Sequence, residues 1–358
     1  DDHTILIKFF LHQSQAEQKV AIEQMKSDPY REFLADEFDY EQNKNYDLYL
    51  NHINEIMKET DFPFAPWIVV PSANRKMASK HVLGTSIEII RNGLSAIDKK
   101  RKQEQKFVHR VGALKSDLES LDLSPELSKD DYKEVIDELQ ERAGDLAYSL
   151  YYRNIPVVIV FEGTDAAGKG GTIRRLLHHI DARIYDINPT SGPSEIEKDH
   201  HYLWRFYNNF PRDGNMAIFD RSWYGRVMVE RVEGFANEYE WSRAYEEIRN
   251  MENELLENNV ILLKFLLITS KEEQSERFKE REEEKPYKIN DEDWRNREKW
   301  DDYMVAMNEM LDETSTDSAP WHVVSGEDKR YARVEVLKTF IKAVENHLEN
   351  LDGAKIVE

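Results

Sequence analysis

The sequence predicts an α/β fold in which a parallel β-sheet is flanked by helices and the domain is duplicated. Three observations support this prediction. A glycine-rich loop joins an apolar run to a helix-like segment, apolar runs alternate with helix-like stretches after that loop, and several motifs recur far along the chain. Buried apolar strands alternating with helices are typical of a parallel sheet covered on both faces.

The glycine-rich loop spans residues 161–172 and follows the apolar run 155–160. Strand, glycine loop, lysine and helix start make the P-loop pattern, whose backbone N–H groups and helix N-terminus bind phosphate oxygens. Lys169 follows the second glycine of the pattern, but Gly170 stands where a Mg²⁺-binding hydroxyl is usual, and Asp165 lies inside the loop. The substrate-binding residues expected from this loop are Gly163, Ala166, Gly168, Gly170, Gly171 and Thr172.

Four apolar runs after residue 150 predict strands, and helical stretches are expected between them, for example at 240–257 and 271–283. The strands are expected at 157–161, 216–219, 260–267 and 321–324. Ligands of such sheets bind outside the carboxyl ends of the strands. The P-loop and the segment 217–226 both fall at that edge, so we expect one site there.

Asp220 ends the second predicted strand. An acid in this place, downstream of a P-loop, is the expected carboxylate on the Mg²⁺ side of a phosphate site, and it would share the metal with Asp165. Taken alone, Asp220 also fits a strand-end cap. Arg205, Arg221 and Arg231 flank this strand, and guanidinium groups suit bidentate phosphate contacts, although each arginine taken singly fits a surface salt bridge equally well.

The repeat joins the two ends of the chain. Residues 5–11 recur as 261–267, and residues 65–70 recur as 319–324. A period of about 255 residues indicates duplicated domains rather than a solenoid. Residues 1–97 are therefore interpreted as the C-terminal half of a first domain whose N-terminal half is absent. Residues 98–140 are interpreted as a linker, and 141–358 as a complete P-loop domain.

The combined motifs resemble the polyphosphate kinase 2 family, and the fused copies are similar to its two-domain subgroup. The resemblance rests on the P-loop, on Phe219 to Tyr224, on the segment 293–300, which is similar to the lid of that family, and on 319–321 followed by 328–333. It implies a P-loop kinase-like fold with a helical lid. It also implies Mg²⁺-dependent transfer of a terminal phosphoryl group from polyphosphate to AMP, giving ADP.

The resemblance assigns roles to individual residues of the second copy. It implies that the lid cations face phosphate, whereas the aligned residues of the first copy are Glu41, Asn43 and Asn45, so the first copy is expected to be catalytically degenerate. The expected catalytic residues are Asp165, Lys169, Asp220, Arg221, Arg205 and Arg231, with Asp165 and Asp220 as metal ligands. The further substrate-binding residues are Lys288, Arg295, Arg297 and Lys299.

Two other functions remain compatible with the residues. An ATP-dependent nucleoside-monophosphate kinase shares most of the P-loop features, and a non-catalytic scaffold that binds polyphosphate or nucleotide fits the degenerate first copy.

Composition narrows the partners. The 358 residues carry a formal charge of −21, which disfavours general nucleic-acid binding but allows a local basic cleft for a polyanion. No apolar run of membrane-spanning length and no signal peptide are recognised, so a soluble, cytoplasmic protein without a membrane partner is expected. The absence of cysteine fits a reducing compartment. A homo-oligomer formed through the kinase-like domains is a further expectation.

Overall fold

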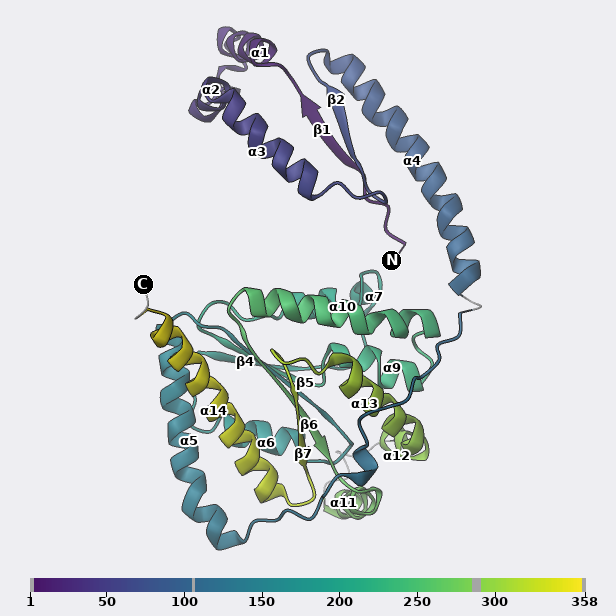
Figure 1. The fold of residues 1–358 in the computed structure, drawn as a ribbon, viewed down its shortest axis with the longest axis vertical. Helices are drawn as coiled ribbons and strands as arrows, with labels where there is room; N and C mark the ends of the chain where they lie inside the picture. Colours follow the sequence, from purple (N-terminus) through teal and green to yellow (C-terminus); the bar gives the residue numbers. More distant parts are fainter. Residues whose placement is uncertain (1–2, 105–106, 285–290, 356–358) are drawn as a thin grey trace. The chain divides into compact units, whose positions relative to one another are not determined.

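The computed structural model describes residues 3–104, 107–284 and 291–355 of the chain. It divides into two compact units, unit 1 at residues 1–106 and unit 2 at residues 107–358 (Figure 1). No helix among the described residues is long and apolar enough to span a membrane.

Unit 1 contains two parallel strands and four α-helices within its described residues. Strands β1 (Lys8–His12) and β2 (Trp67–Pro71) pair in parallel, with Lys8 opposite Trp67. The α-helices are α1 (Gln15–Ser27), α2 (Glu37–Lys44), α3 (Tyr46–Glu59) and α4 (Arg75–Glu104), and a short 3₁₀ turn covers Glu32–Leu34.

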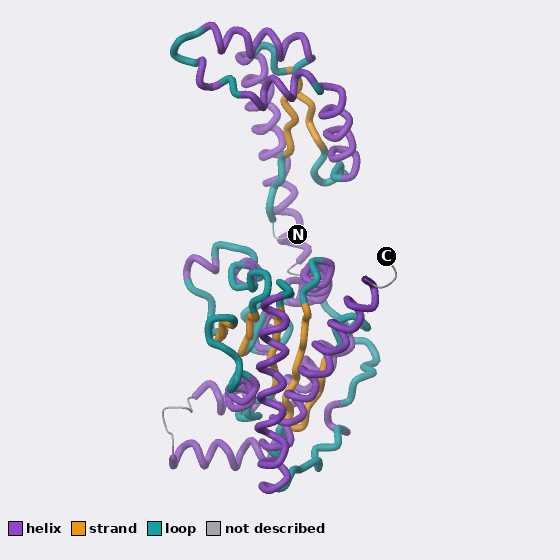
Figure 2. Tube along the Cα trace, turned by 90° about the vertical axis from the view of Figure 1, so that its left-hand side faces the viewer, coloured by secondary structure: helices purple, strands orange, loops and turns teal. Residues whose placement is uncertain are grey.

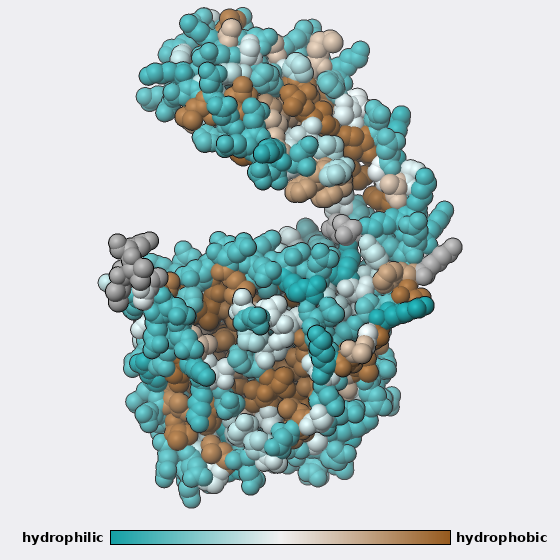
Figure 3. Space-filling model, in the orientation of Figure 1, coloured by the Kyte–Doolittle hydropathy of each residue, from teal (hydrophilic) through white to brown (hydrophobic). Residues whose placement is uncertain are grey.

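Helix α1 begins where the sequence provides an N-terminal signal. The Ser14 hydroxyl accepts the Glu17 backbone N–H, and the Glu17 carboxylate accepts the Ser14 N–H, which satisfies two otherwise unpaired donors. In Figure 3 apolar residues gather on the visible face of unit 1 around the two strands and α4, and Leu11, Val69 and Leu83 are each more than half exposed.

Unit 2 is built on a five-stranded parallel sheet in the order β4-β5-β3-β6-β7. The strands are β3 (Val157–Gly163), β4 (Tyr185–Pro189), β5 (Met216–Asp220), β6 (Ile261–Ile268) and β7 (Trp321–Ser325). The central strands β3 and β6 are buried along nearly their whole length because helices cover both faces of the sheet.

Each face of the sheet has its own layer of helices, and the sheet lies between them in Figure 2. Helices α5 (Lys129–Tyr152), α6 (Lys169–Leu176) and α14 (Lys329–Lys355) bury Leu150, Leu176 and Phe340 against one face. Helices α10 (Glu238–Glu257) and α13 (Trp300–Thr314) bury Ile248 and Met310 against the other. This arrangement confirms the predicted P-loop kinase-like fold.

The remaining elements of unit 2 are short or lie at the edge that carries the predicted site. They are α7 (Glu195–Lys198), α8 (Trp204–Tyr207), α9 (Val229–Val232), α11 (Lys271–Glu284), α12 (Asp291–Glu298) and 3₁₀ turns at Leu118–Ser120 and Trp223–Arg226. Helices α12 and α13 follow each other at the position predicted for the helical lid.

The segment 98–140, which the sequence suggested as a linker with some helix, contains parts of two helices and a stretch that packs on unit 2. Its start continues helix α4 as far as Glu104, and its end belongs to α5. Between them, Leu118 is buried in the core of unit 2 and its N–H donates to the Asn308 side chain at 3.0 Å. Because the apolar residues of this stretch form no continuous run, the buried Leu118 gave no signal of packing.

The four predicted strands are confirmed to within one or two residues. A fifth strand, β4, was missed because it lies at the edge of the sheet and only two of its five residues are even partly buried. It therefore lacks the apolar run that identified the others.

Candidate functional site

The loop after β3 has P-loop geometry, and two glycines are required by it. Gly163 has φ +138°, and a Cβ built on it would lie 1.9 Å from the Leu267 carbonyl oxygen, so β3 and β6 could not pair with a larger residue here. Gly168 has φ +100° at the N-cap of α6. Backbone in this region favours glycine, which lets the loop turn into the helix.

Lys169 lies inside the curve of the loop. Its Nζ donates to the carbonyl oxygens of Gly163 at 2.8 Å and Thr164 at 3.2 Å. Burial lowers the pKa of Lys169, while the charges of Asp165, Asp220 and Glu162 oppose that shift. A Cβ on Gly170 would lie 3.9 Å from Asp220 Oδ2, so the position that usually carries a hydroxyl faces the second acid.

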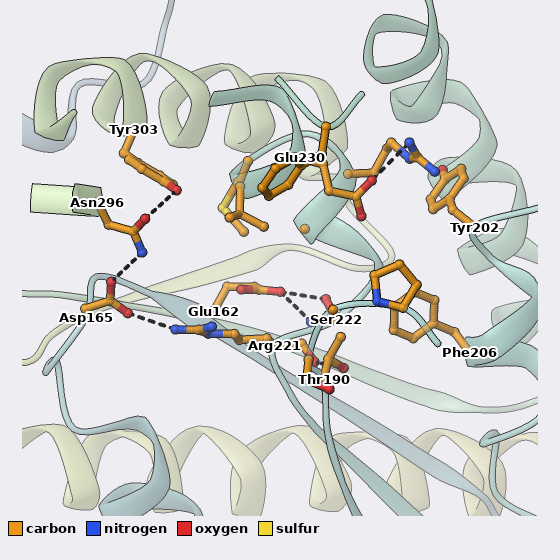
Figure 4. A pocket seen from close by; sticks show the side chains of 18 of the residues that line it. Glu162, Asp165, Thr190, Tyr202, Phe206, Arg221, Ser222, Glu230, Asn296 and Tyr303 are labelled. Atoms are coloured by element: carbon orange, nitrogen blue, oxygen red, sulfur yellow. Dashed lines mark hydrogen bonds and ion pairs between the residues drawn. The ribbon is translucent and has the colours of Figure 1, made fainter. Parts of the chain in front are cut away.

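Both carboxylate oxygens of Asp165 have partners. Arg221 donates to Oδ1 at 3.0 Å and Asn296 donates to Oδ2 at 3.1 Å (Figure 4). Burial raises the pKa of Asp165, but the positive charges of Lys169 and Arg221, with the hydrogen bonds from Asn296 and Arg221, outweigh burial and leave the pKa below its usual value. Asp165 is therefore ionised near neutral pH.

Asp165 and Arg221 line a cavity of about 870 Å³, which has a polar part and an apolar part. In Figure 4 the polar floor of Glu162, Arg221 and Ser222 lies across the cavity from Asn296 and Tyr303. The apolar part of the lining comprises Pro193, Phe206, Met228, Val229, Phe235 and Met307. A cavity that is charged at the P-loop and apolar elsewhere suits a ligand with phosphate at one end and an aromatic base at the other.

Several supporting residues were missed from the sequence. Arg277 of α11 donates to the Ala166 carbonyl at 2.9 Å, and Gln274 donates to the Asp165 carbonyl at 3.2 Å, so this helix fixes the loop from behind. Glu162 is buried, and burial raises its pKa despite hydrogen bonds from the N–H and Oγ of Ser222. A buried arginine in a highly charged helix gives no pattern that separates it from solvated neighbours.

The expected arginines occupy different environments. Arg205 lines the cavity, where its Nη1 donates to the Ser191 carbonyl at 3.0 Å and its Nε lies 3.3 Å from Glu197. Arg231 lies outside the cavity lining. Its Nη1 donates to Glu309 at 2.6 Å and its side chain is 11% exposed. The structure therefore gives Arg231 a partner in α13 rather than a place facing substrate.

The lid segment, residues 293–300, is held on both sides. The Trp294 ring contacts Phe278 of α11 edge to face, and Arg297 donates to the Lys271 carbonyl and to Gln274. Arg295 and Lys299 both contact Glu233 at 3.1 Å. Lys288 lies outside the described residues.

Thr172 faces inward instead of toward the cavity. Its hydroxyl donates to the Gly168 carbonyl at 3.2 Å and the residue is 2% exposed. Any contribution of Thr172 to phosphate binding would therefore come from its helix position.

The two acids fit a metal that takes only part of its ligands from protein. No group of three or more histidine, cysteine or acidic side chains suitable for a cation occurs among the described residues. Mg²⁺ is commonly held by one or two carboxylates together with substrate phosphates and water. Asp220 makes no side-chain hydrogen bond to a described residue, so its oxygens are available, whereas Asp165 would exchange a partner.

A P-loop on a parallel sheet, with an acid at the end of the neighbouring strand, defines a P-loop kinase-like protein. A polyphosphate kinase 2 family model matches residues 1–105 and 126–351. The chain belongs to this family.

Similar proteins agree with this assignment. The chain is 41% identical over 349 residues to a protein of Pseudomonas aeruginosa named polyphosphate:AMP phosphotransferase, covering 96% of the chain and 70% of that relative. It is 34% identical to ADP-polyphosphate phosphotransferase 3 of Rhizobium meliloti, covering 69% of the chain and 86% of the relative. A crystal structure from Pseudomonas aeruginosa, described as a polyphosphate kinase 2, superposes with a TM-score of 0.78 at 39% identity, covering 98% of the chain and 69% of that protein.

Proposed function

We propose that this chain transfers the terminal phosphoryl group of inorganic polyphosphate to AMP and produces ADP. A phosphate oxygen of AMP forms a bond to the terminal phosphorus while the bond from that phosphorus to its bridging oxygen breaks. The polyphosphate leaves one phosphate shorter. Relatives named polyphosphate:AMP phosphotransferase support the proposal. The cavity supports it as well, because it is charged at the P-loop and apolar elsewhere.

The observation that carries the proposal is the arrangement at Asp165. Its carboxylate lies between Arg221 of the strand-end motif and Asn296 of the lid segment, while Lys169 lies in the same loop. Phosphoryl transfer requires chiefly positioning and neutralisation of oxygen charge, and these groups supply both. We assign Lys169, Arg221 and Arg205 to the phosphates, and we assign the apolar walls to the base.

We further propose that Mg²⁺ is the metal, held by Asp165 and Asp220 with phosphate oxygens completing its ligands. A bound Mg²⁺ would neutralise charge that builds on the transferring phosphate. EDTA should then abolish ADP formation, and added Mg²⁺ should restore it. ADP formation that persists in EDTA would contradict the metal assignment.

One assay separates the candidate functions. The protein is incubated with AMP, Mg²⁺ and either polyphosphate or ATP, and ADP is measured with isotopically labelled AMP so that ADP formed from the donor is distinguished. We expect labelled ADP only with polyphosphate. Product only with ATP would indicate a nucleoside-monophosphate kinase, and no product with either donor would favour a binding scaffold.

The acceptor can be checked in the same assay, because a relative is named for ADP. We expect AMP to be phosphorylated faster than ADP at equal concentration. The cytoplasmic location, the absence of nucleic-acid and membrane partners, and a homo-oligomer remain predictions of the sequence.

A further inference from the structure

Glu233 is a buried acid that the proposed chemistry does not use. It follows helix α9 immediately, and its side chain is only 5% exposed. Its Oε2 is 3.1 Å from Arg295 Nε and 3.1 Å from Lys299 Nζ, while its Oε1 is buried without a hydrogen-bond partner among the described residues. Lys299 also donates to the Val232 carbonyl at 3.2 Å. The end of α9 therefore receives three contacts from the lid segment.

Glu233 depends on these contacts more than its two cationic partners do. A carboxylate withdrawn from water is unfavourable unless cations compensate it, and removing one partner leaves the charge uncompensated. Arg295 and Lys299 are 49% and 35% exposed, so either could reach solvent more cheaply than Glu233 could lose them. Glu233 thus favours one position of the lid segment.

The position of the lid segment that Glu233 favours also fixes the position of the Asn296 side chain. Asn296 lies between the two cations in the sequence, donates to Asp165 Oδ2 at 3.1 Å and accepts from the Tyr303 hydroxyl at 3.2 Å. Figure 4 shows the Asn296 amide directed at Asp165 and Tyr303 directed at Asn296. The same short segment therefore has one attachment at α9 and another at the P-loop.

We propose that Glu233 is a positioning residue for polyphosphate binding: it holds Arg295 and Lys299, the two lid cations that the sequence assigns to polyphosphate, and keeps Asn296 on Asp165. The proposal rests on the proposed function, since it takes polyphosphate as the donor. Glu233 does not touch the substrate in this account. It acts through the two cations.

The opposite effect of Glu233 would be competition. An acid bound to two cations occupies donors that phosphate needs, and its removal would then strengthen polyphosphate binding. Positioning and competition therefore predict opposite changes in the KM for polyphosphate when the charge of Glu233 is removed at nearly constant shape.

The test is Glu233→Gln in the full chain, assayed with polyphosphate and AMP. We expect the KM for polyphosphate to rise about tenfold, the effect of misplacing binding groups, with kcat changed less than about threefold. Glu233→Asp should recover part of the loss. Glu246→Gln, an exposed acid on α10, is the matched control and should leave both parameters unchanged.

A mutant cycle shows whether Glu233 acts through the cations. In an Arg295→Gln, Lys299→Gln background, adding Glu233→Gln should change the KM for polyphosphate by less than about twofold, because the groups that it positions are gone. The proposal would be overturned if Glu233→Gln alone lowered the KM for polyphosphate. It would also be overturned if Glu233→Gln raised that KM by the same factor in both backgrounds. A fall in both kcat and thermal stability, with the KM for polyphosphate unchanged, would overturn it as well.

A readout without substrate separates this proposal from the function itself. Hydrogen exchange of residues 294–299 should quicken in Glu233→Gln and stay unchanged in Glu246→Gln. If wild-type protein uses ATP rather than polyphosphate, the proposed function fails while faster exchange still reports the attachment. If exchange is unchanged although the wild type uses polyphosphate, the positioning role fails alone.

Discussion

Units 1 and 2 preserve the same small hydrogen-bonded arrangement but differ in what surrounds it. In unit 2, Trp321 Nε1 donates to Thr314 Oγ1 at 2.9 Å, and Lys264 Nζ donates to the Thr314 carbonyl. In unit 1, Trp67 donates to Thr60 at the same 2.9 Å, and Lys8 donates to the Thr60 carbonyl. We call this tryptophan–threonine–lysine arrangement the hook.

The surroundings of the two lysines differ sharply. Lys264 is fully buried and pairs with Glu252 at 2.8 Å, an acid that α10 supplies. Unit 1 has no counterpart of α10 within its described residues, and Lys8 is partly exposed. The repeat therefore preserves backbone anchoring in both copies, whereas the buried ion pair exists in one.

The lid side of the cavity shows the same division. A cavity of about 330 Å³ in unit 1 is lined by Gln18, Gln42, Tyr46, Tyr49 and Ile53, which align with Gln274, Asn296, Trp300, Tyr303 and Met307 of the larger cavity. Unit 1 thus has residues that correspond to one wall of the unit 2 cavity, and its own cavity has no counterpart of the charged floor among its described residues. This supports, without testing, the prediction that unit 1 is catalytically degenerate.

The largest expected effect comes from the charged floor. Lys169→Ala should reduce ADP formation at least about 100-fold, because a positioned cation at the transferring phosphate is removed. Circular dichroism should show that the fold is retained. Lys8→Ala in unit 1 is the comparison, and it should leave the rate within a few fold. A Lys169→Ala variant with near wild-type activity would refute the assigned role.

The hook offers a stability comparison within one chain. Lys264→Met should destabilise unit 2 by about 3–5 kcal/mol, because Glu252 would remain buried without its cation. Lys8→Met should destabilise unit 1 by about 1 kcal/mol, since a partly exposed group loses a hydrogen bond and its contacts with the Phe62 and Trp67 rings. Urea unfolding monitored by tryptophan fluorescence measures both. Equal losses would show that the buried ion pair is not what distinguishes the copies.

Asn296 should control the acid limb of the rate profile. The folded pKa of Asp165 lies below its usual value, so its ionised form persists as the pH falls and is lost only through that lowered pKa. Asn296→Asp replaces a donor with a like charge, which raises the pKa of Asp165 and moves the loss of activity to higher pH. A pH–rate profile measures this shift. Gln42→Glu, at the aligned position of unit 1, should leave the profile unchanged.

Arg297 should give the smallest effect. Asn43, its counterpart, donates to the Gln15 carbonyl and to Gln18, as Arg297 does to the Lys271 carbonyl and Gln274. Arg297→Asn should therefore keep the KM for polyphosphate within about threefold. Arg295→Asn is the comparison and should raise that KM further. If Arg297→Asn has the larger effect, Arg297 binds phosphate as the sequence suggested.

The sequence predicted the fold and the P-loop because both depend on local patterns. Apolar runs identified β3, β5, β6 and β7, and glycine spacing identified the loop that contains Lys169 and Asp165. The edge strand β4 and the packed segment around Leu118 were missed, since neither has a continuous apolar pattern. The ion-pair partners of individual arginines and lysines could not be predicted from the sequence either. Nothing local separates Arg231, bound to Glu309, from Arg205 beside the cavity.

The hook has a consequence for how the two copies can diverge. It closes the short connection from a helix to the next strand in each copy, with the tryptophan and the lysine both bonded to the same threonine. One set of residues thus holds the helix-to-strand connection in place, and another set carries out the reaction. A copy can lose the second set without losing the first. Mutational tolerance should therefore be lowest at Thr60 and Trp67 in unit 1, even though no substrate is expected there.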